Sequence, residues 1–292
     1  MKQGILVKAI AGFYYVETGS AVYECKARGL FRKQEQAPLV GDRVVIETAP
    51  DGKGVVESIL ERKNCFGRPP VANLDQLVVV VSVCEPKANP LLMDRMIAIA
   101  EDREVEPVVV ITKNDLSDGE GLAAPYRKAG VPVYLVCCPT GEGIGPLRER
   151  LRGRTSAFCG NTGVGKSSLL NALAPQLELS TGEISKKLGR GRHTTRHVEL
   201  YSLGEESYIA DTPGFSSLDA LEGEMVSKDN LPFAFREFAP YLGQCRFSSC
   251  SHTGEKGCAI ARAVEKGEIH PLRYENYVQL YKQSSAIKEW EK

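Results

Sequence analysis

The stretch from Gly160 to Ser168 has the residue types and spacing of a phosphate-binding site. It reads Gly-Asn-Thr-Gly-Val-Gly-Lys-Ser-Ser and matches the phosphate-loop pattern G-x-x-x-x-G-K-[ST]. Glycines let backbone N–H groups converge on phosphate oxygens, and the dipole of a following helix favours negative charge there. We expect Lys166 to reach the β- and γ-phosphates and the Ser167 hydroxyl to bind Mg²⁺. The expected nucleotide-binding residues of this loop are Gly160, Asn161, Thr162, Gly163, Val164, Gly165, Lys166, Ser167 and Ser168.

The flanking sequence favours this interpretation over a glycine turn that only joins a strand to a helix. Residues 156–159 have the composition of a short buried strand, and residues 168–173 have the pattern of a helix that Pro175 ends. Strand, glycine loop and helix are the context in which this motif binds phosphate. A nucleoside triphosphate is therefore the predicted ligand.

Four polar residues after the apolar run 108–111 predict which base is bound. Thr112, Lys113, Asn114 and Asp115 resemble the guanine-reading motif [NT]-K-x-D of GTPases. The Asp115 carboxylate can accept two hydrogen bonds from guanine N1 and N2, which adenine does not offer. Such a short string also occurs as an ordinary exit from a strand, but at a strand end in a chain with a phosphate loop it indicates GTP. An ATP-dependent enzyme would require a different role for Asp115.

A second loop fits the same base. Residues 137–143 follow the apolar run 133–136 and stand where GTPases place the loop whose backbone N–H meets guanine O6. We expect Cys138 to supply this contact. Cys137 and Cys138 stand where Ser and Ala are commoner, and a backbone contact tolerates that change.

Two further segments have the character of GTPase switches. The basic, glycine-bearing stretch 184–196 ends in two threonines, of which Thr195, with Thr194 as the alternative, is expected to bind Mg²⁺ and sense the γ-phosphate. Residues 211–214 fit D-x-x-G. Asp211 should hold Mg²⁺ through water, and the Gly214 N–H should meet the γ-phosphate.

Three positions bear on catalysis. Phe215 stands where Ras-like enzymes place the glutamine that orients the attacking water, so slow intrinsic turnover is expected. Gly163 stands where potassium-activated GTPases carry asparagine, and no potassium site is predicted. His193 either orients water once its loop is ordered or is a histidine on a mobile basic loop. The expected catalytic residues are Lys166, Thr195, Gly214 and, as one of these alternatives, His193.

The order of these motifs is unusual, because the guanine-reading residues precede the phosphate loop. The central domain, residues 66–217, is therefore expected to be a circularly permuted, doubly wound α/β GTPase domain. Its second switch falls near the end of the domain, where a free end would fray, so a further module should anchor it. Expected strands are 77–81, 108–111, 133–136, 156–159, 198–201 and 207–210, and expected helices are 90–103, 121–129, 145–151 and 168–173.

Three cysteines and a histidine late in the chain predict a metal site. Cys245, Cys250, His252 and Cys258 have the spacing C-x4-C-x-H-x5-C, which suits one closed, structural Zn²⁺. Unrelated buried cysteines are the other interpretation. Residues 218–292 are expected to form a mostly helical zinc-binding domain, whose last helix, 272–288, carries a core-facing tyrosine stripe. The remaining separate cysteines, Cys25, Cys65, Cys84 and Cys159, are expected to be small core residues.

The N-terminal segment, residues 1–65, has short β-rich pieces bounded by turn residues and predicts a small β-barrel of the OB type. The basic stretch 26–33, which contains Phe31, is either an oligonucleotide-binding loop or a solvated hairpin. Residues 64–70 have the composition of a linker.

Composition excludes some functions. The formal net charge is +0, so no global field attracts the molecule to nucleic acid or membrane, and such contacts must use local patches. We expect no membrane span and no signal peptide at the N-terminus. Nine cysteines without such a signal favour a reducing, cytoplasmic location. A monomer is expected.

Barrel, permuted GTPase domain and C-x4-C-x-H-x5-C together resemble the small ribosomal subunit biogenesis GTPase family (RsgA-type) over essentially the whole chain. The resemblance implies GTP hydrolysis, stimulated by the small ribosomal subunit and coupled to its late maturation, with binding to its rRNA and contact with other assembly factors. A GTP-regulated RNA-binding scaffold with incidental hydrolysis is the alternative from another class.

Overall fold

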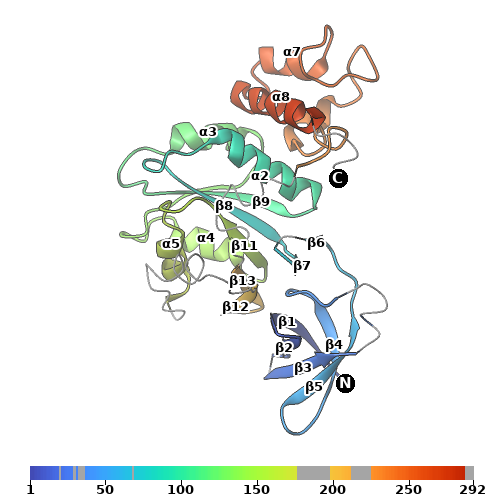
Figure 1. Cartoon of the computed structure of the whole chain (residues 1–292). Coiled ribbons are helices and arrows are strands. Elements are labelled where there is room, and N and C mark those ends of the chain that lie inside the picture. The colour runs from blue at the N-terminus through green and yellow to red at the C-terminus, as the bar shows by residue number, and fades with distance from the viewer. Residues whose placement is uncertain are drawn as a thin grey trace.

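The computed structural model describes residues 1–19, 21–28, 31, 37–67, 69–175, 198–211 and 225–286, with backbone only for Asp211. The described chain forms three parts in a row (Figure 1). A β-barrel lies at one end, a sheet flanked by helices lies in the middle, and a helical module lies at the other end. This is the predicted architecture.

The N-terminal barrel closes as the alternating sequence predicts. Its strands pair in the order β1-β2-β3-β5-β4, and β4 returns to β1, so no sheet edge is left open. Its core combines the buried Phe31 ring with fully buried smaller side chains, which are Val16, Cys25, Val44, Ile46 and Val56. The strands are β1 (Lys2–Ile10), β2 (Phe13–Glu17), β3 (Val22–Ala27), β4 (Arg43–Thr48) and β5 (Lys53–Ile59).

The stretch that reads as a linker takes part in a short hairpin. β6 (Cys65–Phe66) and β7 (Val71–Ala72) form a short hairpin whose Phe66 ring is buried. Beside it, Arg62 donates to the buried Asp42 carboxylate at 2.7 and 2.8 Å. The prediction that the separate cysteines are core residues holds for Cys25 and Cys159. It is wrong for Cys65, which is exposed because it lies on the outer side of this hairpin's pleat, and Cys84 is only half-buried.

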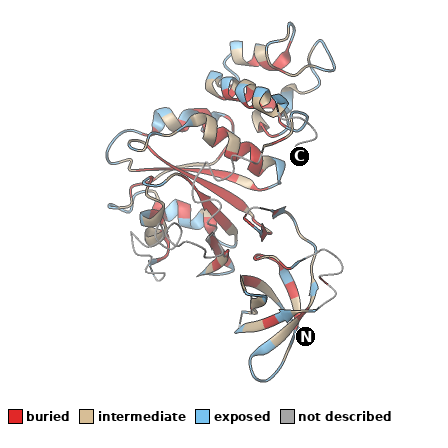
Figure 2. Ribbon diagram, viewed as in Figure 1, coloured by how far each residue is buried: buried red, intermediate tan, exposed pale blue. Residues whose placement is uncertain are grey.

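The central sheet is mainly parallel. Its strand order is β10-β9-β8-β11-β13-β12, with β12 antiparallel to β13. All of β8 is buried, as its continuous run of valines predicts, and Figure 2 shows this buried layer through the middle of the molecule. The strands are β8 (Gln76–Ser82), β9 (Glu106–Thr112), β10 (Val133–Leu135), β11 (Thr155–Cys159), β12 (Glu199–Gly204) and β13 (Ser207–Asp211).

Helices cover both faces of this sheet. Side chains alternate along β8, so that Val79 and Val81 pack on one side with α2, while Val78 and Val80 pack on the other with α4 and α5. The helices are α2 (Pro90–Asp102), α3 (Glu120–Lys128), α4 (Ile144–Leu151) and α5 (Lys166–Leu173). The alternating pattern of the sequence therefore gave the correct fold class.

The barrel is joined to the central sheet by a strand pairing that no sequence motif predicts. β1 pairs with β12 at Lys8 and Glu199, which also form a side-chain ion pair of 2.9 Å. This pairing makes one continuous hydrogen-bonded sheet from the barrel and the central domain.

The C-terminal module contains the 3₁₀ helix η4 (Arg236–Tyr241) and the helices α7 (Ala259–Glu265) and α8 (Pro271–Ala286). Phe235, Phe238 and Tyr277 form its aromatic centre, with ring centroids 4.8 to 5.3 Å apart. Tyr277 is fully buried and Tyr274, Val278 and Tyr281 pack around the core, which confirms the core-facing stripe. Within the described part of the chain, no helix has the length and apolar character needed to cross a membrane.

Candidate functional site

Most of the predicted nucleotide-binding residues meet at one edge of the central sheet. β8, β9, β10, β11 and β13 are mutually parallel, so their carboxyl ends lie on the same side. The phosphate-loop residues follow β11, the guanine-reading residues follow β9, and the loop 137–143 follows β10. A doubly wound sheet binds ligands at this edge.

The phosphate loop has a backbone that only glycine allows. Gly160 has a φ of +151°, and a Cβ atom there would lie 2.2 Å from the carbonyl oxygen of Val80. Gly165 has a φ of +92° and is the residue from which α5 begins. The loop therefore turns sharply out of β11 and presents the N-terminus of α5 towards the sheet edge, the geometry that suits a phosphate.

Lys166 lies across this loop. Its Nζ donates to the carbonyl oxygen of Gly160 and, at 3.1 Å, to that of Asn161. Burial lowers the pKa of Lys166 to about 8, against a smaller opposing effect of Cys159. Ser167 is the next residue of α5, and Ser168 beside it is exposed.

Thr112 connects the base-reading segment to the phosphate loop. Its hydroxyl is buried and lies 2.5 Å from the carbonyl oxygen of Val164 and 3.1 Å from that of Val81. The shorter contact, with Val164, ties the phosphate loop to the end of β9, whereas donation of the single hydroxyl hydrogen to Val81 ties β9 to β8. The two motifs are therefore mechanically joined.

The rest of the base-reading segment is open on one side. Asp115 is exposed, whereas the Asn114 side chain accepts a hydrogen bond from the Gly119 N–H at 3.0 Å. The Asn114 N–H contacts the carbonyl oxygen of Val136 at 3.4 Å, which places the loop containing Cys138 beside it. Lys113 has a φ of +60°, and its Nζ donates to the carbonyl oxygen of Glu85 at 2.5 Å.

Several predicted catalytic positions lie outside the described residues. These are His193, Thr194, Thr195, Gly214 and Phe215. Asp211 is described by its backbone, as the last residue of β13 at the same sheet edge. The structure therefore describes the phosphate loop and the end of β13, but not the rest of the two predicted switches.

The predicted zinc ligands do come together. The ligand atoms of Cys245, Cys250, His252 and Cys258 all lie within 4.8 Å of one another. His252 Nδ1 is 3.4 Å from Cys245 Sγ and 3.5 Å from Cys258 Sγ, and these two sulfur atoms are 4.0 Å apart. Tetrahedral Zn²⁺ places S and N ligands about 3.6 Å apart and two S ligands about 3.8 Å apart. The three separations among Cys245, His252 and Cys258 are therefore close to those of a tetrahedral zinc site.

Glu255 organises this cluster and was not predicted from the sequence. Its carboxylate accepts hydrogen bonds from the Ser251 N–H at 2.7 Å and the Thr253 N–H at 2.8 Å, on both sides of His252. These bonds, with the Ser251 hydroxyl, outweigh partial burial and lower the pKa of Glu255 to about 2. Its place in the sequence could have indicated this role. Glu255 lies between two predicted zinc ligands, His252 and Cys258, where the N–H groups of a tight loop need a hydrogen-bond acceptor.

Comparison with known proteins agrees with this arrangement. The family model described as RsgA GTPase matches residues 59–221, and the RsgA N-terminal domain model matches residues 3–56. The small ribosomal subunit biogenesis GTPase RsgA of Geobacillus thermodenitrificans is 46% identical over 284 residues, which is 95% of this chain and 96% of that protein. The protein of that name from Caldanaerobacter subterraneus is 44% identical and covers 99% of this chain and 97% of its own.

Solved structures extend the similarity to the fold. YjeQ from Thermotoga maritima has a TM-score of 0.84 and 36% identity over 98% of this chain and 99% of its own. YloQ, described as a circularly permuted GTPase, has a TM-score of 0.82 and 35% identity over 99% of this chain and 96% of its own. The chain therefore belongs to the RsgA GTPase family, and its central domain is a circularly permuted GTPase domain.

Proposed function

We propose that this GTPase hydrolyses GTP at the carboxyl edge of its central sheet while bound to the small ribosomal subunit, whose late maturation it assists. The observation that supports this most strongly is the meeting of the phosphate loop, the guanine-reading residues and the loop after β10 at one edge. The partner is inferred from relatives that are named small ribosomal subunit biogenesis GTPases and align with nearly the whole chain. A role on such a subunit places the protein in the cytoplasm.

The proposed residue roles are those that the sequence motifs predict, and the positions of the described residues at this sheet edge support them. Backbone N–H groups of residues 160–166 bind the phosphates, and Lys166 supplies positive charge. Ser167, Thr195 and, through water, Asp211 would hold Mg²⁺. Bound Mg²⁺ would supply positive charge against the charge that develops on the phosphates. Asp115 and the Cys138 N–H read guanine. The Gly214 N–H contacts the γ-phosphate.

The lowered pKa of Lys166 predicts pH-dependent nucleotide binding. Without nucleotide, this amine is charged below about pH 8 and neutral above it. Bound phosphates favour the charged form and raise the pKa, so binding takes up a proton. Affinity for GDP should be constant below about pH 8 and fall up to about tenfold per pH unit above it. Titration of a fluorescent GDP analogue from about pH 7 to 9 measures this. Lys166→Arg, which stays charged, should flatten the profile, and a flat wild-type profile would contradict the prediction.

Small subunits should stimulate hydrolysis. The protein has Phe215 in place of a water-orienting glutamine, so it should turn over slowly alone, because the attacking water lacks an orienting group. Docking of the basic stretch 184–196 on rRNA phosphates would bring His193 and Thr195 into place, and an electrostatic contact of this kind weakens steeply as salt rises. The expected stimulation is at least tenfold and should disappear at high salt.

GTP turnover with purified small subunits, large subunits and no ribosomes tests this proposal. Equal rates in all three would support the GTP-regulated scaffold with incidental hydrolysis. His193→Ala should lower the stimulated rate much more than GTP affinity if His193 orients water. If the rate is unchanged, His193 is only a residue of the basic stretch.

The other two parts of the chain provide the remaining contacts in this proposal. The barrel binds rRNA through residues 26–33, of which Lys26 lies over the Phe13 ring at 5.3 Å from its centroid. The cluster of Cys245, Cys250, His252 and Cys258 holds one Zn²⁺ that fixes the C-terminal module, and all four coordination positions are filled by protein. Domain limits of 1–65, 66–217 and 218–292 describe these three functions, with the protein acting as a monomer.

A further inference from the structure

The loop that follows β8 lies at the nucleotide edge of the sheet without belonging to a GTP-binding motif. It consists of residues 83–87 and is called the β8 loop here. β8 lies between β11, which leads into the phosphate loop, and β9, which leads into the guanine-reading residues. The β8 loop therefore starts between the two motifs that bind the nucleotide.

The β8 loop is tied to the end of its own strand. Ser82, the last residue of β8, is 1% exposed, and its hydroxyl oxygen accepts a hydrogen bond from the Cys84 N–H at 3.2 Å. The chain then returns to the same residue through an isolated bridge between Ser82 and Lys87. Because both arms of the loop are fixed at Ser82, its tip, formed by Glu85 and Pro86, has a defined position.

On one side the β8 loop contacts the guanine-reading segment. The Val83 N–H donates to the carbonyl oxygen of Thr112 at 3.2 Å, and the Glu85 carbonyl oxygen accepts from Lys113 Nζ at 2.5 Å. A Cβ atom at Gly119 would lie 3.1 Å from Val83 Cγ1, so Val83 also packs against the turn that follows the motif. The loop thus holds both the backbone and the lysine side chain of this segment.

On the other side the β8 loop faces the phosphate loop. Gly163 has a φ of +87°, and a Cβ atom there would lie 3.5 Å from Pro86 Cδ. Proline has a fixed φ and also restricts the backbone of the residue before it. Pro86 therefore sets the position of the Glu85 carbonyl relative to the phosphate loop.

The Glu85 carbonyl can prepare Lys113 for a bound base. Lys113 is half-buried, and a lysine stem can lie along an aromatic base only in a few of its many rotamers. A partner that holds the ammonium group beforehand removes this freedom, and such pre-organisation raises affinity. The hydrogen bond to Glu85 supplies that partner.

We propose that the β8 loop positions Lys113 against guanine. The Glu85 carbonyl holds the lysine extended, while Ser82 and Pro86 keep that carbonyl at a fixed place beside the phosphate loop. These three act through Lys113 and are positioning residues. The inference rests on the proposed binding of guanine nucleotides at this sheet edge and names residues that adjust the affinity of that site.

Pro86→Ala is the first test, with Pro70→Ala as its matched control. Pro70 is an exposed proline between β6 and β7, outside the nucleotide edge. Without the proline ring, Lys113 should be in place in about a tenth of the molecules, which raises the Kd for GDP about tenfold. Pro70→Ala should bind GDP as the wild type does. Competition against a fluorescent GDP analogue measures both.

Ser82→Ala tests the same loop from its base. Its matched control is Ser156→Ala, which removes another buried hydroxyl, one that accepts from Gln76 Nε2 at 2.9 Å near the start of β11. Ser82→Ala should raise the Kd for GDP about fivefold, the worth of one hydrogen bond. Ser156→Ala should lower the thermal unfolding midpoint and leave GDP affinity unchanged. If Pro86→Ala does not fold, Ser82→Ala decides.

A double-mutant cycle separates positioning from a general structural role. Lys113→Met keeps a long side chain without the ammonium group and should raise the Kd for GDP about tenfold. Combined with Pro86→Ala, the loss should stay near tenfold, because both changes remove the same held lysine. A loss near a hundredfold would show that Pro86 acts independently of Lys113 and would overturn the proposal.

The wild type shows which of the two proposals fails. If it binds ADP as tightly as GDP, the proposed guanine site is wrong and the positioning of Lys113 is wrong with it. If it prefers GDP while Pro86→Ala and Ser82→Ala match their controls in GDP affinity, only the positioning is wrong.

Discussion

Replacing Asp115 with Asn should lower affinity for GDP about a thousandfold and create affinity for xanthosine diphosphate. A carboxylate accepts two charge-assisted hydrogen bonds from guanine N1 and N2, each contributing about 1.5 to 3 kcal/mol. An amide offers one acceptor and one donor, which suits N1–H and the additional oxygen of xanthine. The structure favours this role because Asp115 is exposed at the end of β9, on a loop that Asn114 holds beside the Cys138 loop.

The loop offers a matched control for this substitution. Asp118 is also exposed, but its carboxylate accepts a hydrogen bond from the Glu120 N–H at 3.0 Å, at the start of α3. Asp118→Asn should therefore leave the base preference unchanged. Competition of GDP, XDP and ADP against a fluorescent analogue measures all three proteins. The assignment is wrong if adenine nucleotides compete with guanine nucleotides on equal terms in the wild type.

Local patterns predicted the elements and the fold class. The valine run of β8 indicated a strand buried on both faces, and strand ends in a parallel sheet must share an edge. Because motif residues followed the strands directly, placing the strands also placed Asp115 and Lys166 at that edge. The zinc cluster was predicted for a similar reason, since its four ligands lie close in sequence and chemistry restricts their partners.

Contacts between distant segments could not be predicted in this way. Asp94 and Arg273 are 179 positions apart, and Lys8 and Glu199 are 191 apart. A charged residue on a helix suggests a solvent-facing position unless its partner is known. The hairpin at residues 65–72 was missed because Gly and Pro indicate a turn or linker equally well. Tertiary packing decides which distant segments pair, and a single sequence contains little information about that packing.

The second large effect is expected from loss of a zinc ligand. Cys250→Ala should remove the metal and unfold the C-terminal module, because apparent zinc-binding energies of about 10 kcal/mol or more are folding energies in such modules. Cys65→Ala is the control, an exposed cysteine outside the cluster. Elemental analysis of protein purified without chelators should give one zinc per chain in the wild type and the control, and none in Cys250→Ala.

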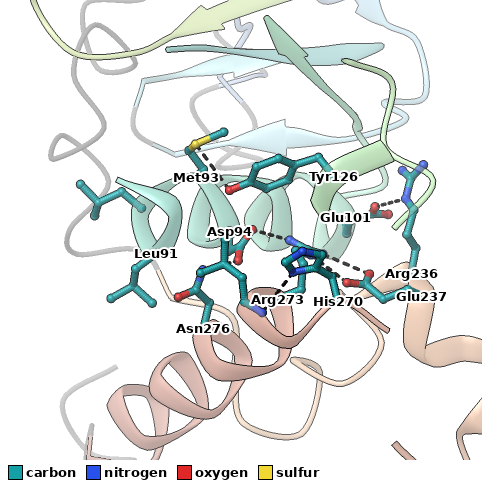
Figure 3. Close-up of polar contacts among 12 residues, drawn as sticks. Leu91, Met93, Asp94, Glu101, Tyr126, Arg236, Glu237, His270, Arg273 and Asn276 are labelled. Carbon is teal, nitrogen blue, oxygen red and sulfur yellow. Dashed lines mark hydrogen bonds and ion pairs between the residues drawn. The ribbon is translucent and has the colours of Figure 1, made fainter. Parts of the chain in front are cut away.

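The damage should spread beyond the zinc cluster. Tyr277 of α8 donates to the carbonyl oxygen of Ser251 at 2.7 Å, so the metal loop and α8 are held together. If α8 is released, Asp94 loses its hydrogen bonds to Arg273 and Asn276 (Figure 3), and the face of α2 that α8 covers is opened to water. Hydrogen exchange should therefore rise first in α8 and then in α2, while the barrel is unaffected. Wild type without zinc, or unchanged exchange of α8 in Cys250→Ala, would show that the cluster does not stabilise the fold.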